Sequence, residues 1–244
     1  MWTTKGLARG VLSTPYPHAR ETAPGVTPGR PVATPVSSPA EGRALAEVCP
    51  TGALSYQGGA VEVELRRCIS CLRCRRASPA MRWEDDFAWA ELLSDNAPPD
   101  RSFRHSLHVR IVDAGDGGET LRELKQLTGP YYAIHRLGIF ITPTPRQADV
   151  LLVVGTVTQG TRQALLDTYE AMPEPKWVMA VGSAAASGVP FGPSFTTLGG
   201  VAELLPVDIV VPGDPPPPLA ILDGLLLLMG RKRPQAAAAG RSKS

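Results

Sequence analysis

The chain has 244 residues, a formal net charge of +2 at pH 7 and four cysteines. This length can form one medium-sized domain with a substantial core plus a small domain. The longest apolar stretch, residues 219–229, is interrupted by Asp223 and is too short to cross a bilayer. The charge balance neither favours nor excludes nucleic acid, and no basic groove with interleaved aromatic residues supports such a partner.

The first 106 residues are expected to form three segments. Residues 1–40 contain seven prolines and few large apolar residues, so we expect an extended segment that follows a partner surface or is disordered alone. Residues 41–80 predict a small α+β domain, with a helix at 44–48 and a hairpin from 53–56 and 61–65. Residues 81–106 form a polar linker, whose aromatic residues pack the pieces together or onto a neighbour: Trp83, Phe87 and Trp89.

From residue 107 the pattern changes to alternating strands and helices. Strands are predicted at 108–113, 139–142, 150–154, 177–181 and 207–211, and helices at 119–127, 162–171 and 219–228. Continuous apolar strands that alternate with helices indicate a parallel sheet covered on both faces. Sites in such sheets lie at the carboxyl ends of the strands, here residues 113–119, 155–160, 182–188 and 212–216. This domain is predicted to span residues 107–230, followed by a disordered tail, 231–244.

The cysteines show a spacing typical of iron–sulfur ligands. Cys68, Cys71 and Cys74 are each separated by two residues, and Cys49 precedes a proline. Bacterial ferredoxins contain the run C-x₂-C-x₂-C-x₃-C-P twice, and the fourth cysteine of each run ligates the other cluster. The remaining ligand positions of the two runs hold residues without sulfur: Pro39, Gly42, Leu45 and Ser78. Crossed ligation then leaves one complete set, so we predict one [4Fe–4S] cluster on Cys49, Cys68, Cys71 and Cys74.

Two other interpretations of this segment remain open. Four thiolates also suit tetrahedral zinc, although zinc sites usually pair two C-x₂-C knuckles. Disulfides are disfavoured because close cysteines in a chain without a signal peptide indicate a reducing compartment. Six arginines surround the cysteines and either raise the potential of an anionic cluster or form a solvated basic face: Arg66, Arg67, Arg73, Arg75, Arg76 and Arg82.

Four stretches of the second domain carry a resemblance to a known family. They are R-Q-A-D-V-L-L-V-V-G-T-V-T (146–158), M-P-E-P-K-W-V (172–178), V-P-G-D-P-P-P-P (211–218) and L-D-G-L-L-L-L (222–228). This part resembles the small subunit shared by respiratory complex I (the 20-kDa, or B, subunit) and membrane-bound [NiFe] hydrogenases such as formate hydrogenlyase. The segment R-G-V-L-S-T-P-Y-P (9–17) and the cysteine region resemble the ferredoxin-like subunit of the same complexes. The resemblance implies a fusion of two neighbouring subunits, with a degenerate ferredoxin-like domain followed by a flavodoxin-like α/β domain.

The chain departs from this family at the ligands of the terminal cluster. The family places two cysteines after the first strand, a third in a G-x-C-x-x-S-G loop and a fourth in P-G-C-P-P. Here the first loop, residues 115–119, contains no sulfur, and the later positions correspond to Ala184 and Asp214. The α/β domain is therefore expected to lack a cluster. Asp214 with Asp116 and Glu119 is an alternative oxygen site for a hard cation, and solvated loop carboxylates are the simpler interpretation.

Other candidate residues have weaker signals. The segment 155–161 is either a weak anion-binding loop or ordinary strand-to-helix packing, and His105, His108 and His135 show no metal-ligand spacing. By the resemblance, Tyr131, Tyr132 and Arg136 lie where the family contacts its large catalytic subunit, although core and surface roles remain open.

The sequence supports two functional hypotheses. The first is an electron-transfer subunit of a complex I-like or hydrogenase-like assembly, non-catalytic alone. Its partners would be a large-subunit-like protein and membrane-arm subunits, which would place it on the cytoplasmic face of a membrane. The second is a structural or assembly subunit in which the cluster, or zinc, only stabilises a segment with a small core.

Overall fold

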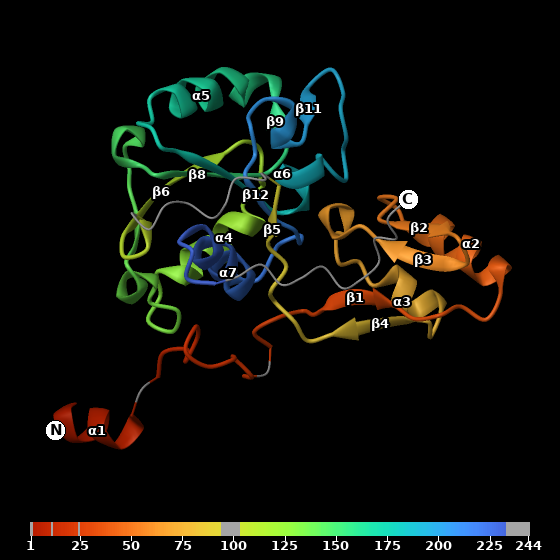
Figure 1. The fold of residues 1–244 in the computed structure, drawn as a ribbon, viewed down its shortest axis with the longest axis horizontal. Helices are drawn as coiled ribbons and strands as arrows, with labels where there is room; N and C mark the ends of the chain where they lie inside the picture. The colour runs from red at the N-terminus through yellow and green to blue at the C-terminus, as the bar shows by residue number, and fades with distance from the viewer. Residues whose placement is uncertain (1, 11, 24, 94–102, 233–244) are drawn as a thin grey trace.

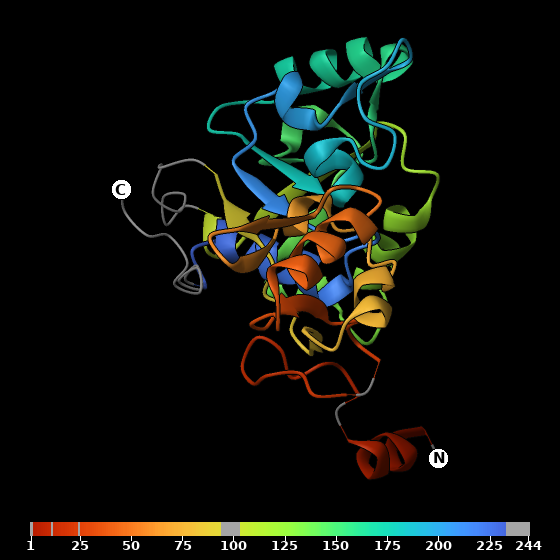
Figure 2. The ribbon, with the colours of Figure 1, turned by 90° about the vertical axis from the view of Figure 1, so that its right-hand side faces the viewer.

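The computed structural model describes residues 2–10, 12–23, 25–93 and 103–232. Figure 1 shows an α/β domain, a smaller part beside it and a short N-terminal helix, α1 (Trp2–Arg9), that projects from the body. We call residues 30–84 the cysteine lobe and residues 103–232 the α/β domain. Seen from the side of the lobe, the orange lobe lies in front of the domain (Figure 2).

The α/β domain is built on a six-stranded sheet with the order β5-β12-β10-β8-β6-β7. Five of its strands are parallel, and β5 pairs with β12 in the antiparallel direction. The strands are β5 (Glu91–Leu92), β6 (Leu107–Asp113), β7 (Ile139–Ile141), β8 (Val150–Val154), β10 (Trp177–Val181) and β12 (Ile209–Val211). The central strand β8 is wholly buried and reads V-L-L-V-V, as expected for a strand covered on both faces.

Helices cover both faces of this sheet. Leu152 and Val154 of β8 share one core with α4 (Glu119–Leu127) and α7 (Pro218–Leu228). Leu151 and Val153, which point to the opposite face, pack with α5 (Gln159–Glu170) and α6 (Ser183–Ser187). In Figure 1, α5 lies on one side of the sheet and α4 and α7 lie on the other. The predicted parallel sheet with two covered faces is confirmed.

Short elements complete the α/β domain. A two-stranded antiparallel sheet joins β9 (Val157–Thr158) to β11 (Thr197–Gly199) beside α5. Thr158 caps α5 through a reciprocal pair of hydrogen bonds with Thr161. Single 3-10 turns are η3 (Ile134–Leu137), η4 (Pro145–Gln147) and η5 (Val201–Glu203).

The cysteine lobe contains two small antiparallel sheets and two helices. β1 (Arg30–Ala33) pairs with β4 (Met81–Glu84), and β2 (Leu54–Gln57) pairs with β3 (Ala60–Val63). The helices are α2 (Pro39–Val48) and α3 (Arg73–Ala77), and one 3-10 turn, η1 (Leu65–Arg67), precedes the cysteine loop. Ser38 caps α2, and the hairpin β2–β3 packs against this helix. The buried core of the lobe consists of five residues: Leu45, Leu54, Val61, Ala80 and Met81.

Several elements differ from the sequence-based expectation. Residues 1–40 contain a helix and strand β1, and the linker contributes β4 and β5, where no regular structure was expected. These strands form because they pair with distant partners, which a local pattern does not reveal. The aromatic residues of the linker join the two parts: Phe87 and Trp89 lie in the core of the α/β domain, and Trp83 lies in the lobe. The predicted tail and part of the linker, residues 233–244 and 94–102, lie outside the described residues.

The N-terminal segment is fixed to the α/β domain by buried polar contacts. Tyr16 donates a short hydrogen bond to Asp223 of α7, and Lys232 contacts the same carboxylate. Arg136 donates to the carbonyls of Thr14 and Tyr16 at 2.8 Å and 2.6 Å. Burial, followed by the charge of Asp223, raises the pKa of Tyr16 far above its ordinary value, so its hydroxyl stays a donor.

Replacement of Gly42 by Ala tests the packing of the lobe. A Cβ at Gly42 would lie 2.2 Å from the Cδ2 atom of Tyr56, so the ring must move. We expect Gly42→Ala to lower the free energy of unfolding by about 1–3 kcal/mol, as measured by urea unfolding. Gly160→Ala in the first turn of α5 is the control, because its Cβ meets nothing nearer than 3.9 Å. An equal response of the two variants would contradict this packing.

Candidate iron–sulfur site

The four cysteines converge on one hollow of the lobe. Cys49 follows α2, Cys68 follows η1, Cys71 lies in the loop and Cys74 lies on α3. All four line the same hollow, together with Pro31 of β1 and Trp83 of β4. Cys71 is exposed, and the other three are partly buried. The structure therefore brings together the whole set of residues that the spacing singled out.

The backbone of the cysteine loop adopts an unusual conformation. Ser70 and Leu72 have φ angles of 51° and 62°, in the left-handed region. Such a conformation costs about 1–3 kcal/mol for a residue with a side chain and is most common at ligand sites. In this loop it reverses the chain between successive cysteines, so that their side chains face one hollow.

The Cys49 sulfur accepts hydrogen bonds from its surroundings. The Ala53 N–H lies 3.2 Å from Cys49 Sγ, and the Thr51 hydroxyl lies 3.6 Å from it. Burial raises the pKa of this thiol, but the contacts of its sulfur with the Thr51 side chain and with the N–H groups of Thr51, Ala53 and Leu54 outweigh burial and lower the pKa. Hydrogen bonds to a cysteine sulfur stabilise the thiolate, which is the form that binds metal.

The pKa values of two other thiols, Cys68 and Cys74, shift in the opposite direction. Burial, with smaller contributions from the other three cysteines, raises the pKa of Cys68 to about 11. Burial and the charges of Cys71 and Cys49 also raise the pKa of Cys74. These interactions agree with the shared hollow that the four cysteines line. A metal centre reverses this effect, because a thiol that coordinates it loses its proton.

The size of the hollow limits what it holds. Its volume is about 20 Å³, which is room for little more than one water molecule. Among the residues described, no three His, Cys, Asp or Glu side chains form a group that could hold a metal ion. A cubane places each thiolate on a different iron atom, so its ligands lie farther apart than those of one ion. A cluster at this position therefore needs a wider hollow than the one in this structure.

The other positions of the two ferredoxin-type runs have packing roles. Leu45 is 2% exposed and belongs to the lobe core. Gly42 lies directly against the Tyr56 ring, and Ser78 donates a short hydrogen bond to Glu41. Apolar packing and hydrogen bonds therefore occupy the region where a second cluster would need its ligands.

The cysteine loop is docked on the carboxyl end of the sheet in the α/β domain. The Ser183 hydroxyl donates to the Cys68 carbonyl at 2.8 Å, and Ser187 donates to the Arg66 carbonyl at 2.9 Å. Ser183 is fully buried and also accepts from the Gly213 N–H at 3.2 Å. Sequence reasoning missed both serines, and the only signal for them is their four-residue spacing on one side of α6.

The contact with the lobe covers loops that the family resemblance associates with cluster ligands. Ser183 adjoins Ala184, and Pro212 and Gly213 line a second hollow with Cys68. Asp214 follows directly and is half-buried. The cysteine loop of this chain thus lies beside the loops in which the resembled family carries its cluster-binding cysteines.

The loop after β6, residues 115–119, is tightly packed against the backbone at Gly155. A Cβ on Gly155, where φ is 78°, would lie 2.2 Å from the Asp116 N atom. Asp116 is buried and accepts hydrogen bonds from Thr120 N at 3.3 Å and Leu121 N at 3.0 Å, so it caps α4. The expected alternatives for this region, a hard-cation site and an anion-binding loop, are replaced by helix capping and loop packing.

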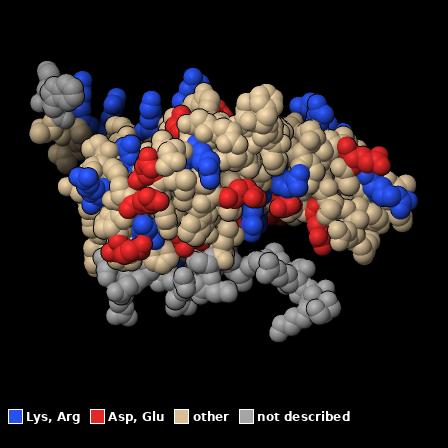
Figure 3. Space-filling model, turned by 90° about the horizontal axis from the view of Figure 1, so that it is seen from above, with Lys and Arg blue, Asp and Glu red and all other residues tan. Residues whose placement is uncertain are grey.

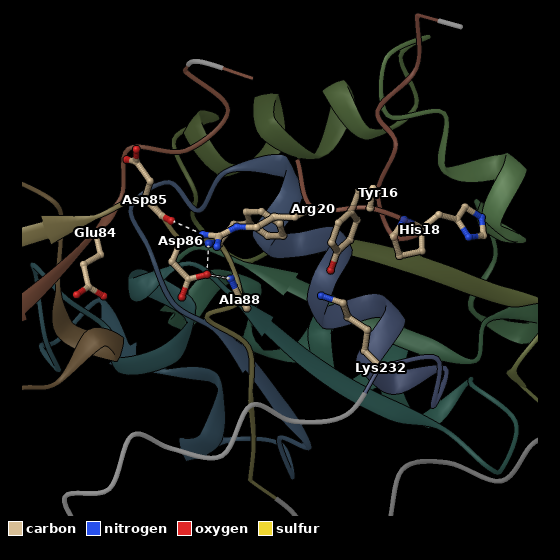
Figure 4. A pocket seen from close by; sticks show the side chains of 11 residues that line it. Tyr16, His18, Arg20, Glu84, Asp85, Asp86, Ala88 and Lys232 are labelled. Carbon is tan, nitrogen blue, oxygen red and sulfur yellow. Dashed lines mark hydrogen bonds between the residues drawn. The ribbon is translucent and has the colours of Figure 1, made fainter. Parts of the chain in front are cut away.

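Two of the three residues predicted to contact a large subunit bind the N-terminal segment, residues 14–21. Tyr131 donates to Glu21 at 2.8 Å, Arg136 binds the carbonyls of Thr14 and Tyr16, and Tyr132 is buried in the core. This segment borders an open cleft of about 440 Å³. Figure 4 shows its acidic wall of Glu84, Asp85 and Asp86, with Lys232 on the opposite side.

Outside this acidic wall, basic and acidic side chains lie near one another. Arg20 in the cleft donates to the Asp85 carbonyl at 2.8 Å. Near the cysteine loop, Arg66 pairs with Glu91 at 2.7 Å and Arg67 donates to the Thr51 carbonyl at 2.9 Å. Lys and Arg intermingle with Asp and Glu on the face shown in Figure 3.

The fold and the cysteine hollow define an α/β protein with an attached thiol-bearing lobe. Residues 118–228 match the family model described as "NADH ubiquinone oxidoreductase, 20 Kd subunit". The chain is 48% identical over 89 residues to the B subunit of the NADH-quinone oxidoreductase from Heliobacterium modesticaldum. That alignment spans 36% of this chain and 51% of the relative, so the chain spans about half of the relative's length. Residues 118–228 are therefore similar to the 20-kDa subunit family, which supports the predicted resemblance of this part.

Two solved structures are also similar. One is the archaeal membrane-bound sulfane sulfur reductase, with 33% identity and a TM-score of 0.47 over 52% of this chain and 70% of that chain. The other is an NAD⁺-reducing [NiFe]-hydrogenase in the H₂-reduced state, with 15% identity and a TM-score of 0.42 over 55% and 96%.

Replacement of Ser183 tests the docking of the lobe. Ser183→Ala leaves the Cys68 carbonyl and the Gly213 N–H without this partner, so we expect a loss of about 1–3 kcal/mol in unfolding free energy. Urea unfolding measures it. The control is Thr168→Ala, which removes a hydroxyl that bonds only within α5. Unfolding of Ser183→Ala at the wild-type midpoint would contradict a role in docking.

The Asp214 carboxyl predicts a specific pH dependence. Burial, then the charges of Glu119 and Asp116, raises its pKa from 3.8 to about 6. The folded protein thus retains a proton that the unfolded chain releases, so this contribution to stability is complete below about pH 4 and lost as the pH rises through 6. Asp214→Asn should lack this decline and be more stable than the wild type at pH 7, as urea unfolding from pH 4 to 8 will measure. A parallel pH profile for the two proteins would contradict the shift; Glu170→Gln, at an exposed carboxylate, is the control.

Proposed function

We propose that this protein is an iron–sulfur electron-transfer subunit of a complex I-like or hydrogenase-like respiratory assembly. Its single [4Fe–4S] cluster would be held by Cys49, Cys68, Cys71 and Cys74. The α/β domain would carry no cluster, because the sequence contains no cysteine outside the lobe. The observation that carries the proposal is the convergence of four thiols on one hollow, from separate parts of a chain whose residues 118–228 match the 20-kDa family model.

The residues around the hollow suit this role. A bound cubane supplies one-electron redox chemistry. The Ala53 N–H donates to the Cys49 sulfur and favours its thiolate form. Ser183 fixes the Cys68 loop through its carbonyl. We identify no acid–base or nucleophilic constellation in the hollow, so we assign the protein no reaction of its own.

The partners follow from the relatives. The relative from Heliobacterium modesticaldum is named as part of an NADH-quinone oxidoreductase. We infer that this chain likewise joins a large-subunit-like protein and membrane-arm subunits. No helix among the described residues is long and apolar enough to cross a membrane. Association with the cytoplasmic face of a membrane would then depend on the partners.

A structural role is the second candidate. Only five buried apolar residues form the core of the lobe, and a core of this size gives little stability. A cluster or a zinc ion that joins α2, η1 and α3 would stabilise the lobe by binding only its folded state. This role needs no electron transfer.

Metal analysis separates these candidates. We expect the full chain, purified without oxygen, to contain four iron and four sulfide per chain and to give a reversible EPR signal on titration with dithionite. Iron that cannot be reduced at an accessible potential would favour the structural role. Zinc without the visible iron–sulfur absorption band would contradict both cluster assignments.

Cysteine variants test the ligands. Cys68→Ser should lose most of its iron, because a hydroxyl replaces a thiolate ligand. Ser78→Ala is the control: Ser78 stands at the closing position of the second run but lies outside the hollow, so its iron content should stay at the wild-type level. Equal iron in both variants would contradict the assigned ligand set.

A further inference from the structure

A buried hydrogen-bond donor without a partner lies in the wall of the cysteine hollow. Trp83 lines this hollow with the four cysteines. Its Nε1 atom is inaccessible to solvent and has no hydrogen-bond partner among the described residues. An unpaired buried donor costs about 1–3 kcal/mol, so proteins usually give it an acceptor.

The position of Trp83 is fixed by the small sheet of the lobe. Strand β4 pairs with β1, and Trp83 stands opposite Pro31, which also lines the hollow. Met81 is two residues away on the same face of β4 and is buried in the lobe core, against which Cys49 and Cys74 pack. The sheet therefore directs the indole toward the cysteines, while Arg82 and Glu84 on its other face are exposed.

We propose that the indole N–H of Trp83 donates a hydrogen bond to a sulfur of the cluster held by the four cysteines. This inference rests on the proposed function, because the acceptor is the cluster. Thiolate and sulfide atoms are the acceptors that a cubane brings to this wall. Trp83 is then a positioning and tuning residue, which acts through the charge on the sulfur.

The hydrogen bond has a defined effect on the redox equilibrium. The reduced cluster carries one more negative charge than the oxidised cluster, so a donor stabilises the reduced form more. Loss of the N–H should shift the ratio of reduced to oxidised cluster at a fixed potential by about tenfold. For a one-electron couple this corresponds to a midpoint potential lower by about 59 mV.

The test compares two tryptophan variants of the full chain. Trp83→Phe removes the N–H but keeps an aromatic ring, and the EPR signal gives its midpoint potential. Trp177→Phe is the matched control, because the Trp177 Nε1 is also buried and unpaired but the residue lies on β10, outside the hollow. We expect full iron and sulfide in both variants and a lower potential only in Trp83→Phe.

Full iron in Trp83→Phe with the wild-type potential overturns the hydrogen bond and leaves the proposed function intact. Wild-type protein without iron and sulfide overturns both proposals. If Trp83→Phe does not fold, pulsed EPR of the reduced Trp89→Phe protein labelled with ¹⁵N-indole tryptophan tests the bond, because the Trp89 Nε1 is also buried and unpaired and Trp89 lines a hollow with Cys68. A ¹⁵N coupling supports the bond, and its absence overturns it.

Discussion

The hydrogen bond from Ser183 to the Cys68 carbonyl joins the two parts of this protein at the point where its chemistry is expected. It fixes the first residue of the cysteine loop to helix α6, at the carboxyl end of the central sheet. A second bond, from Ser187 to Arg66, prevents rotation about the first. Because Ser183 also accepts from the Gly213 N–H, the loops after β10 and β12 move together with the cysteines. The cysteine loop is therefore attached to the sheet of the α/β domain through α6.

The regions that would hold further clusters in the resembled families are packed rather than open. In the lobe, Leu45 belongs to the core and Gly42 touches Tyr56. In the α/β domain, the chain at Gly155 lies against the backbone of Asp116. Side-chain and backbone contacts fill these regions in this structure. The proposed loss of the other clusters thus agrees with the packing.

Much of the α/β domain could be predicted from the sequence. Strands β8 and β10 are recognisable as continuous apolar runs, and α4 is recognisable by its helical periodicity. These patterns are visible locally because they reflect burial on both faces of a strand or on one face of a helix. Strands β1, β4 and β5 could not be predicted, since each is short and stable only through pairing with a distant segment. The cysteine spacing identified the candidate ligands. It could not identify Ser183 or Trp83, whose roles depend on which surfaces meet in space.

The connection between lobe and domain has a consequence for assembly. Strand β5 leads out of the lobe and pairs with β12, so the linker itself forms the edge of the main sheet. Two separate proteins that met through a few hydrogen bonds would dissociate at cellular dilution, since association must overcome lost translational freedom. Here the covalent link keeps the contacting surfaces of the lobe and the α/β domain at an effective concentration of about millimolar. A weak contact can therefore persist without a large apolar interface, and the stoichiometry of lobe to domain is fixed at one to one by translation.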